Sequence, residues 1–414
     1  MTKTIAVLAT MDTKGAECAY LRDEITRLGA RALLIDIGVV GDANIDVDIA
    51  SAEIAAKGGT GLAALRDNPS RETASEVMIL GATAALLDLI TAKKVDGIIS
   101  LGGTQGTNNC CRVMQALPYG FPKVMLSTMA SGDTSGYVGI KDITMMFSVS
   151  DILGLNPFFR RILSNAAGAV VGMADAAIEI EFDAAKPVIG ITNLGVLTQG
   201  TMRAMELLAE RGYETIVFHA VGAGGRAMEQ LMRDGFITAV FDYALGDITD
   251  ALFGGIRAAD EDRLTVAGQL GIPQVVVPGG VDHIGILLDE PNTVPDAYKD
   301  RLYSYHNPVI LVPRTTGPEL VRMMEEIRDR LSHSKANTVF MLPTKGVSSY
   351  SVAGGVLYDG ESDAAFFAAV REMLPKHVPL IEVEAGAEDP AFVGRAVDEL
   401  VKLIEGSEAT ATTG

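Results

Sequence analysis

The sequence predicts an α/β protein made of two Rossmann-like, doubly wound domains with mostly parallel sheets. Short β-branched runs alternate with longer helical patterns, and the runs are continuously apolar, as in parallel strands that helices cover on both faces. The pattern restarts after a charged, proline-containing segment, residues 181–187, so we place a boundary near residue 183. The predicted domains are residues 1–183 and 184–414, which suits a chain of 414 residues.

Strands and helices alternate regularly in the predicted first domain. The strands are expected at residues 4–9, 31–37, 97–101, 123–127 and 143–147. Helical patterns lie at residues 14–28, 49–57 and 71–93, and an Ala- and Gly-rich stretch, residues 151–180, is predicted to be mostly helical. The helix at 14–28 places Leu21, Ile25 and Leu28 on one face, and Gly29 ends it.

The second domain repeats this order. One second sheet is expected from strands at residues 188–192, 215–218, 239–241, 274–277, 309–312, 339–342 and 380–383, with early helices at 200–211 and 224–234. Both domains open with a strand, a Gly/Thr loop and a helix that ends in Gly, which fits either a degenerate repeat or two copies of a common architecture. Two such domains would form a cleft between the carboxyl ends of their strands, where ligands usually sit.

Composition excludes several classes of protein. The chain is 48% hydrophobic and 21% charged, so it can bury sizeable cores and is neither disordered nor a coiled coil. Its net charge of -19 repels nucleic-acid phosphates and anionic lipid, so we expect no nucleic-acid and no membrane partner. Three cysteines are too few for a disulfide framework, and no apolar stretch is expected to span a membrane. We therefore expect a cytoplasmic protein.

The motif ISLGGTQGTNNC, residues 99–110, carries the strongest local signal. A strand runs into Gly102, Gly103, Thr104, Gly106 and Thr107, which are predicted to form a loop that opens a helix. Glycines let backbone amides approach an anion, the hydroxyls add donors, and the helix N-terminus adds partial positive charge. The motif matches neither a Walker A sequence nor GxGxxG, and a tight packing turn is the alternative.

Two further polar loops follow strands of the same predicted sheet. Asp12 and Lys14 come after the first strand, where they could cap the helix or meet a phosphate and a metal or ribose hydroxyl. The hydroxyl-rich loop after the strand at 123–127 contributes Ser127, Ser131 and Asp133. Three such loops at one sheet edge are expected to converge on one binding site.

The second domain holds the candidate acid–base residues. His219 ends a strand, and Asp282 stands beside His283 after another. Together with His306 they could form an acid–base set or metal ligands, although none has HExxH or clustered Cys/His spacing, so the metal remains unknown. The chain has no GxSxG elbow, and Cys18 falls inside a predicted helix, which disfavours acyl transfer through a Ser or Cys nucleophile.

The motifs ATMDTKGAE, LGGTQGT, STMASGD, GITNLGV, FHAVGAGGRAMEQL and VPGGVDH together resemble the UPF0261 family, the Tm-1-like ATP-binding proteins. The resemblance covers residues 3 to about 405. It implies two Rossmann-like subdomains, ATP bound mainly by the first, and a tendency to form homodimers. The same three loops are then implicated in nucleotide binding: Asp12 and Lys14, residues 102–107, and residues 127–133.

These observations lead to one function hypothesis and two alternatives. The first is a cytosolic protein that holds ATP with Mg²⁺ in its first domain and acts on a small metabolite in the cleft, by activation or phosphoryl transfer, with His219, Asp282 and His283 as catalytic residues. The first alternative is a non-catalytic, ATP-gated binding module. The second is a sugar-nucleotide or glycosyltransferase-like enzyme.

Overall fold

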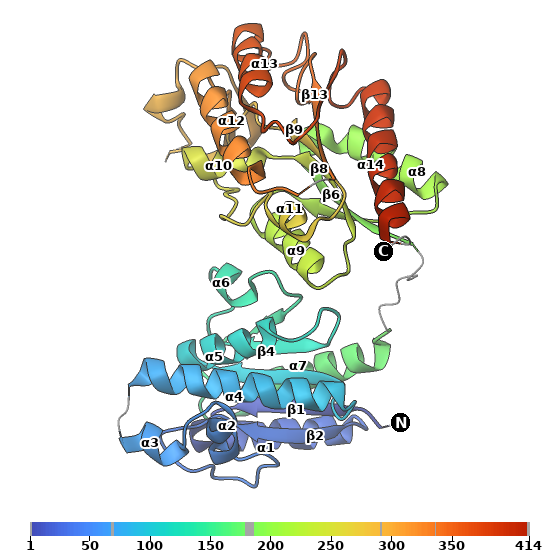
Figure 1. Ribbon diagram of the computed structural model, residues 1–414. Coiled ribbons are helices and arrows are strands. Elements are labelled where there is room, and N and C mark those ends of the chain that lie inside the picture. Colours follow the sequence, from blue (N-terminus) through green and yellow to red (C-terminus); the bar gives the residue numbers. More distant parts are fainter. Residues whose placement is uncertain (1, 68–69, 179–185, 290–291, 336, 412–414) are drawn as a thin grey trace. The chain divides into compact units, whose positions relative to one another are not determined.

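The computed structural model describes residues 2–67, 70–178, 186–289, 292–335 and 337–411 (Figure 1). Its internal contacts divide the chain into a first unit, Met1–Glu181, and a second unit, Phe182–Gly414. The boundary predicted near residue 183 lies outside the described residues. Each unit is an α/β structure around a parallel sheet, so the predicted fold class is confirmed.

The first unit contains a five-stranded sheet in the order β2-β1-β3-β4-β5, with every neighbouring pair parallel. Its strands are β1 (Thr4–Ala9), β2 (Arg31–Asp36), β3 (Gly97–Gly102), β4 (Lys123–Ser127) and β5 (Thr144–Phe147). Its helices are α1 (Met11–Arg27), α2 (Ser51–Lys57), α3 (Leu62–Asp67), α4 (Arg71–Thr91), α5 (Thr104–Gln115), α6 (Ser135–Val138) and α7 (Pro157–Ala176).

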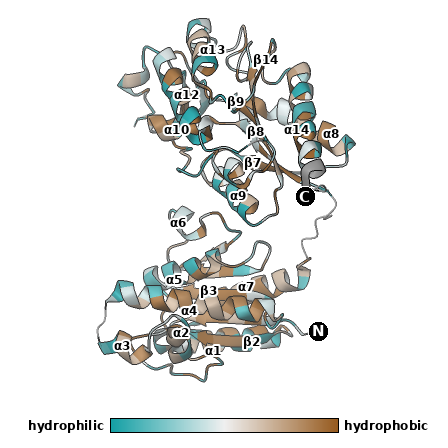
Figure 2. Cartoon of the chain, viewed as in Figure 1, coloured by the Kyte–Doolittle hydropathy of each residue, from teal (hydrophilic) through white to brown (hydrophobic). Residues whose placement is uncertain are grey.

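Successive side chains of β1 enter two different cores, as the two-residue period of a strand requires. Ala6 and Leu8 pack with α2, α4 and α5, whereas Ile5 and Val7 pack with α1 and α7. Figure 2 shows the strands of this unit mostly in the hydrophobic colour, between helices of mixed colour. Burial on both faces explains why the strand sequences are continuously apolar.

The second unit contains a six-stranded parallel sheet in the order β14-β13-β9-β8-β6-β7. These strands are β6 (Val188–Asn193), β7 (Glu214–His219), β8 (Ala239–Ala244), β9 (Gln274–Gly279), β13 (Thr338–Pro343) and β14 (Leu380–Val383). The helices are α8 (Thr198–Glu210), α9 (Ala223–Arg233), α10 (Gly246–Phe253), α11 (Val266–Leu270), α12 (Gly317–Leu331), α13 (Gly360–Met373) and α14 (Pro390–Ala411), with short 3₁₀ turns at Gly195–Leu197 and Asp296–Tyr298.

One predicted member of this sheet lies elsewhere. The strand expected at residues 309–312 is β12 (Ile310–Pro313), the centre of a separate antiparallel sheet with β10 (Ile286–Leu287) and β11 (Tyr303–Asn307). The apolar sequence of β12 is compatible with either sheet, and only its antiparallel pairing with β11 distinguishes them. The prediction that it extends the second parallel sheet is therefore wrong.

Both parallel sheets share one strand order when their strands are numbered along the chain. In each, the second strand lies outside the first and the third lies on the first strand's other side, giving 2-1-3-4-5 in the first unit and 2-1-3-4-5-6 in the second. The order reverses between β1 and β3, and between β6 and β8. In open α/β sheets, such switch points open a crevice at the carboxyl ends of the strands, where ligands bind.

Helix α4 is long and apolar enough to cross a membrane, judged by its length and composition only. Within the first unit it packs against α2, and Gly81 lets the two backbones meet: a Cβ atom there would lie 1.9 Å from the carbonyl oxygen of Ile54. It also packs against α5. These contacts bury one side of α4 within the first unit.

Candidate functional site

The first candidate site is a pocket of about 370 Å³ at the carboxyl edge of the first sheet, which we call the switch-point pocket. It lies beside the ends of β1 and β2 and the start of α5, where the strand order reverses. Its lining residues are Thr10, Asp12, Thr13, Ile37, Val39, Val40, Leu65, Ser70, Arg71, Ala74, Ser75, Met78, Gln105 and Asn109.

Three helices present their first turns to this pocket. Asp12 and Thr13 come from the start of α1, Arg71 from the start of α4, and Gln105 from the start of α5. The N-terminus of α5 has no side-chain cap, since Gly103 occupies the capping position. Unpaired N–H groups and helix dipoles make such ends favourable for anions.

Asp12 is the acidic group of this pocket. Its Oδ2 accepts a hydrogen bond from the Gly41 amide at 3.0 Å, and its Oδ1 is buried without a hydrogen-bond partner among the described residues. The neighbouring Asp36 accepts from the amides of Met11 and Gly38 at 2.9 and 2.8 Å. Burial raises the pKa of Asp36 above its usual value, and the nearby Asp12 charge adds to this effect. An unpartnered carboxylate oxygen of this kind is suited to a hydroxyl or a cation.

Lys14 does not line the pocket, although the sequence places it beside Asp12. Its ammonium group donates to the carbonyl oxygen of Ile152 at 2.5 Å. The residue lies inside α1, which begins at Met11 rather than near residue 14, and its φ of -123° interrupts the helical geometry. The structure thus directs this cation toward the segment that precedes α7.

The glycine-rich motif, residues 102–107, contributes mainly to packing within the first unit, whereas the sequence predicts contacts with a ligand. A Cβ atom on Gly102 would lie 2.8 Å from the Cα of Gly106, so the absence of a side chain at Gly102 allows the end of β3 to contact the first turn of α5. Thr104 is exposed in that turn, whereas the Thr107 hydroxyl is buried and lies 2.6 Å from Ser127 Oγ. Gly103, Thr104 and Gly106 do not line the pocket, although the neighbouring Gln105 does.

The hydroxyl-rich third loop also stays outside the pocket lining. Ser131 and Asp133 are exposed, and the Asp133 carboxylate accepts from the Ser135 amide at 2.9 Å, as at a helix start. That bond lowers the pKa of Asp133. The three loops meet at one sheet edge, as expected, yet only the first, with its Asp12, contributes a predicted residue to this pocket.

The second candidate site is a pocket of about 670 Å³ at the carboxyl edge of the second sheet, which we call the histidine pocket. It gathers His219, His283 and His306, three of the five histidines in the chain. The full lining is Leu194, Gly195, Val196, His219, Val221, Ile256, Arg257, His283, Gly285, His306, Ile310, Val312, Ser349 and Tyr350. The small antiparallel sheet supplies His306, Ile310 and Val312.

Asp282 and His283 form a buried pair behind this pocket. Asp282 Oδ1 lies 3.2 Å from His283 Nδ1, and Asp282 Oδ2 accepts from the Ser348 hydroxyl at 2.5 Å. Burial acts to raise the pKa of Asp282, but His283, Arg314 and the Ser348 hydroxyl together hold it well below its usual range. Asp282 is therefore an ionised group that orients its histidine neighbour.

Arg257 lies on the other side of His283. Its guanidinium pairs with the fully buried Asp250 through Nε and one terminal nitrogen, both at 2.8 Å. The other terminal nitrogen lies 3.3 Å from His283 Nε2. Because arginine only donates, Nε2 must be the acceptor, which places the imidazole proton on Nδ1, facing Asp282.

His219 stands at the more exposed mouth of the histidine pocket. Partial burial lowers its pKa, and the positive charges of Arg257 and His306 lower it further. The predicted set of His219, Asp282 and His283 is thus brought together, with His306 beside it. Among the described residues, no group of three or more His, Cys, Asp or Glu side chains has the arrangement of a metal site.

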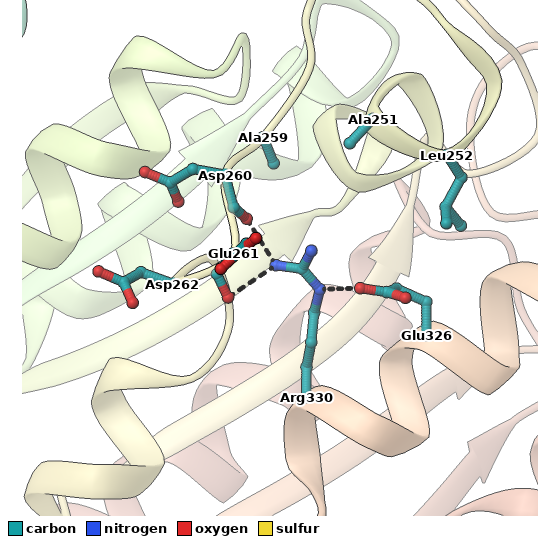
Figure 3. Close-up of a pocket in the computed structure, with 8 residues that line it drawn as sticks. All are labelled: Ala251, Leu252, Ala259, Asp260, Glu261, Asp262, Glu326 and Arg330. Carbon is teal, nitrogen blue, oxygen red and sulfur yellow. Dashed lines mark hydrogen bonds and ion pairs between the residues drawn. The ribbon is translucent and has the colours of Figure 1, made fainter.

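A further hollow in the second unit lies between α10, residues 259–262 and α12 (Figure 3). Arg330 reaches into it, but its guanidinium already binds Glu326 at 2.7 Å and the backbone carbonyls of Asp260 and Arg263 at 2.8 and 2.7 Å. The other polar side chains that line it are acidic. Nothing in this hollow points to a particular ligand.

Several site residues escape sequence reasoning. Arg71 follows a segment with no recognisable motif, and Arg257 and Tyr350 lie in loops far from Asp282 along the chain. Only the topology brings them together. Ser348, which donates to Asp282, could be found from the sequence, because it lies in the polar loop that follows β13.

Comparisons with known proteins agree over nearly the whole chain. Models of the N-terminal and C-terminal domains of the uncharacterised protein family UPF0261 match residues 3–179 and 186–404. A UPF0261 protein of Clostridium tetani is 41% identical over 406 residues, covering 98% of this chain and 100% of that protein. One from Mesorhizobium japonicum is 38% identical over 372 residues, covering 90% and 91%.

A plant protein and a solved structure complete the comparison. The ToMV resistance protein Tm-1(GCR237) of Solanum lycopersicum is 36% identical over 282 residues, which are 67% of this chain and 37% of that protein. The crystal structure of UDP-GlcNAc 2-epimerase from Neisseria meningitidis bound to UDP-GlcNAc aligns with 98% of this chain and 100% of that one, at 10% identity and a TM-score of 0.22. So low a TM-score supports no inference about this chain.

Proposed function

Because the chain belongs to the UPF0261 family, we propose that it is a cytosolic protein that binds ATP with Mg²⁺ in its first unit and a small metabolite in its second. The observation that carries the nucleotide part is the meeting of three helix N-termini, those of α1, α4 and α5, at the switch-point pocket. In a chain of net charge -19, a polyphosphate needs such local positive potential. Arg71 adds the cationic side chain that Lys14 does not supply.

The chemistry of the pocket suits the parts of a nucleotide. Val39, Leu65 and Met78 form an apolar side that can receive a base, and Ser75, Gln105 and Asn109 form a hydrogen-bonded polar side. Mg²⁺ in nucleotide sites is commonly held by one or two carboxylates together with phosphate oxygens. Asp12, with its unpartnered Oδ1, is the carboxylate that would hold it here.

Isothermal titration calorimetry with MgATP tests this assignment. We expect Arg71→Ala, which removes a charged hydrogen-bond donor to the phosphates, and Asp12→Asn, which removes the carboxylate for Mg²⁺, each to weaken MgATP binding by roughly tenfold or more. Lys14→Met, whose ammonium faces Ile152, is the matched control and should retain the wild-type affinity. Equal affinity in all four proteins would refute the site, provided circular dichroism shows them folded.

A measurement of ATP turnover distinguishes an ATP-dependent enzyme from a non-catalytic, ATP-gated binding module. Phosphoryl transfer or activation would proceed through positioning and electrostatics, with His219, Asp282 and His283 acting on the metabolite. An ATPase activity that candidate metabolites stimulate and His283→Ala abolishes would favour the enzyme. Binding without turnover, unchanged by His283→Ala, would favour an ATP-gated module. Nucleotide that binds the second unit alone would favour a sugar-nucleotide enzyme.

The homodimer is part of the same proposal. Light scattering after size-exclusion chromatography should then give twice the chain mass of 43.6 kDa. A mass of one chain at micromolar concentration would exclude a stable homodimer.

A further inference from the structure

We infer that the histidine pocket is an acid–base site for a small organic acid, with Arg257 as the carboxylate anchor and His283 as the proton acceptor. The inference rests on the proposed function only in placing a metabolite in the second unit. It does not require the nucleotide, so its test uses the nucleotide-free chain.

Arg257 is built to hold an anion in a fixed place. Asp250 binds two of its nitrogens at 2.8 Å and also accepts from the backbone amides of Arg257 and Gly285, both at 2.9 Å. The arginine is thereby fixed, and the remaining nitrogen is directed to His283 Nε2 and the pocket. A fixed guanidinium edge recognises a carboxylate with little loss of side-chain entropy.

His283 has the surroundings of a general base. It is 2% exposed, its Nδ1–H faces the ionised Asp282, and Ser348 holds the far oxygen of that carboxylate. A carboxylate on Nδ1 fixes the tautomer and stabilises the imidazolium that forms when Nε2 takes a proton. The terminal nitrogen of Arg257 donates to Nε2; a bound carboxylate would compete for that guanidinium nitrogen and free the histidine.

The walls favour a carboxylic acid over a phosphate ester. Leu194, Val196, Val221, Ile310 and Val312 give the pocket a mostly apolar lining for an organic body. Among the described residues no lysine lines it, and the charge of the lining Arg257 is already balanced by Asp250. A monoanionic carboxylate matches this charge better than a phosphate dianion does.

The chemistry that follows is proton transfer at a carbon next to a carbonyl group. The C–H bond breaks, its electron pair stays on the acid as an enolate, and the proton moves to His283 Nε2. Arg257 stabilises the developing negative charge. Return of the proton to carbon restores His283 and completes an exchange or isomerisation that needs no oxidant, reductant or second substrate.

Two measurements on the full nucleotide-free chain test the inference. Calorimetry compares the monoanions 2-oxobutanoate and 2-oxopentanoate with the phosphate esters glycerol 3-phosphate and phenyl phosphate. Proton NMR in D₂O follows loss of the C3 protons of the bound oxo acids. We expect saturable binding of an oxo acid, weaker binding of both phosphate esters, and enzyme-dependent exchange at C3.

The variants separate anchoring from proton transfer. Arg257→Met with Asp250→Asn removes both charges together, which avoids leaving Asp250 buried and unpaired, and should weaken oxo-acid binding by about tenfold to a hundredfold. His283→Gln should keep that binding but abolish exchange, and the exposed Arg203→Met is the control. Failure of both oxo acids to bind, tighter binding of a phosphate ester, or exchange that survives His283→Gln would each overturn the inference, whatever the outcome with MgATP.

Discussion

The hydroxyl groups of Thr107 and Ser127 lie 2.6 Å apart inside the first unit, where both side chains are fully buried. Ser127 accepts from the Met129 amide at 2.9 Å, and Thr107 lies 3.2 Å from the Gly102 carbonyl oxygen. One directed chain satisfies all four groups: Met129 donates to Ser127, Ser127 to Thr107, and Thr107 to Gly102. These hydroxyls therefore join the ends of β3 and β4 and are not available to a ligand.

Thr107→Val should accordingly reduce stability and leave nucleotide binding intact. The substitution keeps the shape but deprives Ser127 of its acceptor, which costs about 1–3 kcal/mol of unfolding free energy. Urea denaturation measures this loss, and calorimetry with MgATP supplies the second readout. A variant of wild-type stability that has lost MgATP affinity would show that the hydroxyl meets the ligand.

Helix packing in the first unit gives a second prediction, from a pair of glycines. Gly81→Ala places a Cβ atom 1.9 Å from the Ile54 carbonyl oxygen, so α2 and α4 must separate, at a cost of about 1–3 kcal/mol. Gly168→Ala, on an exposed turn of α7 with no atom within 4 Å, should instead stabilise by up to ~1 kcal/mol through helix propensity. The midpoints of thermal and urea unfolding should fall in Gly81→Ala and rise in Gly168→Ala. Equal shifts in the two variants would refute this view of the α2–α4 contact.

The fold could be predicted because both faces of each sheet are buried. Runs such as those at β1 and β4 are largely apolar and buried and are bounded by polar turns, so their limits at Thr4–Ala9 and Lys123–Ser127 match the prediction. The sequence of β12 has the same character, yet it pairs with Tyr303–Asn307, whose residues are mostly exposed. Pairing is a tertiary property, and a single apolar run does not encode it.

Some residues of the candidate sites could likewise be predicted from the sequence, and others depend on tertiary structure. Asp12, His219 and His283 could be found because polar residues at the carboxyl end of a parallel strand, or in the loop that follows it, lie near the sheet edge. The roles of Lys14 and Thr107 could not be predicted, because they depend on the direction of each side chain. Lys14 donates to the Ile152 carbonyl oxygen, and the Thr107 hydroxyl contacts that of Ser127. Arg257 follows no strand directly and reaches His283 through its contact with Asp250.

Arg263 provides a third prediction, because it is among the largest fully buried side chains of the described residues. It binds both oxygens of Asp242 at 2.6 Å and Oδ2 of Asp247 at 2.9 Å. Arg263→Met would leave two buried carboxylates without a cation, so we expect a loss of about 3–5 kcal/mol. Arg203→Met, which breaks an exposed pair with Glu206, should cost less than about 1 kcal/mol in the same urea titration. Similar losses in both would contradict the structural role of Arg263.

The last prediction concerns pH and Glu229. This residue is 1% exposed; its Oε1 accepts from the Leu264 amide at 2.7 Å, while its Oε2 is buried without a partner among the described residues. Burial raises the pKa of Glu229 to about 8, with the charges of Asp242 and Asp260 adding to it and that of Arg263 opposing it. Glu229 is thus protonated in the folded protein at neutral pH.

A carboxyl group that is protonated when folded and ionised when unfolded makes stability fall as pH rises. From its ordinary pKa of 4.5 up to about 8, unfolding releases the Glu229 proton, so the free energy of unfolding should drop by up to ~1.4 kcal/mol per pH unit. Asp363, whose pKa burial raises to about 6, acts in the same direction, but its contribution ends near that pH. Urea titrations between pH 6.5 and 8 therefore exclude Asp363, and circular dichroism follows unfolding because the chain has no tryptophan. Burial also raises the pKa of Asp247, so the difference between the wild type and a Glu229 variant assigns the slope to Glu229. Glu229→Gln should flatten the slope over this range and the exposed Glu210→Gln should not; an unchanged slope in Glu229→Gln would show that another group binds the proton.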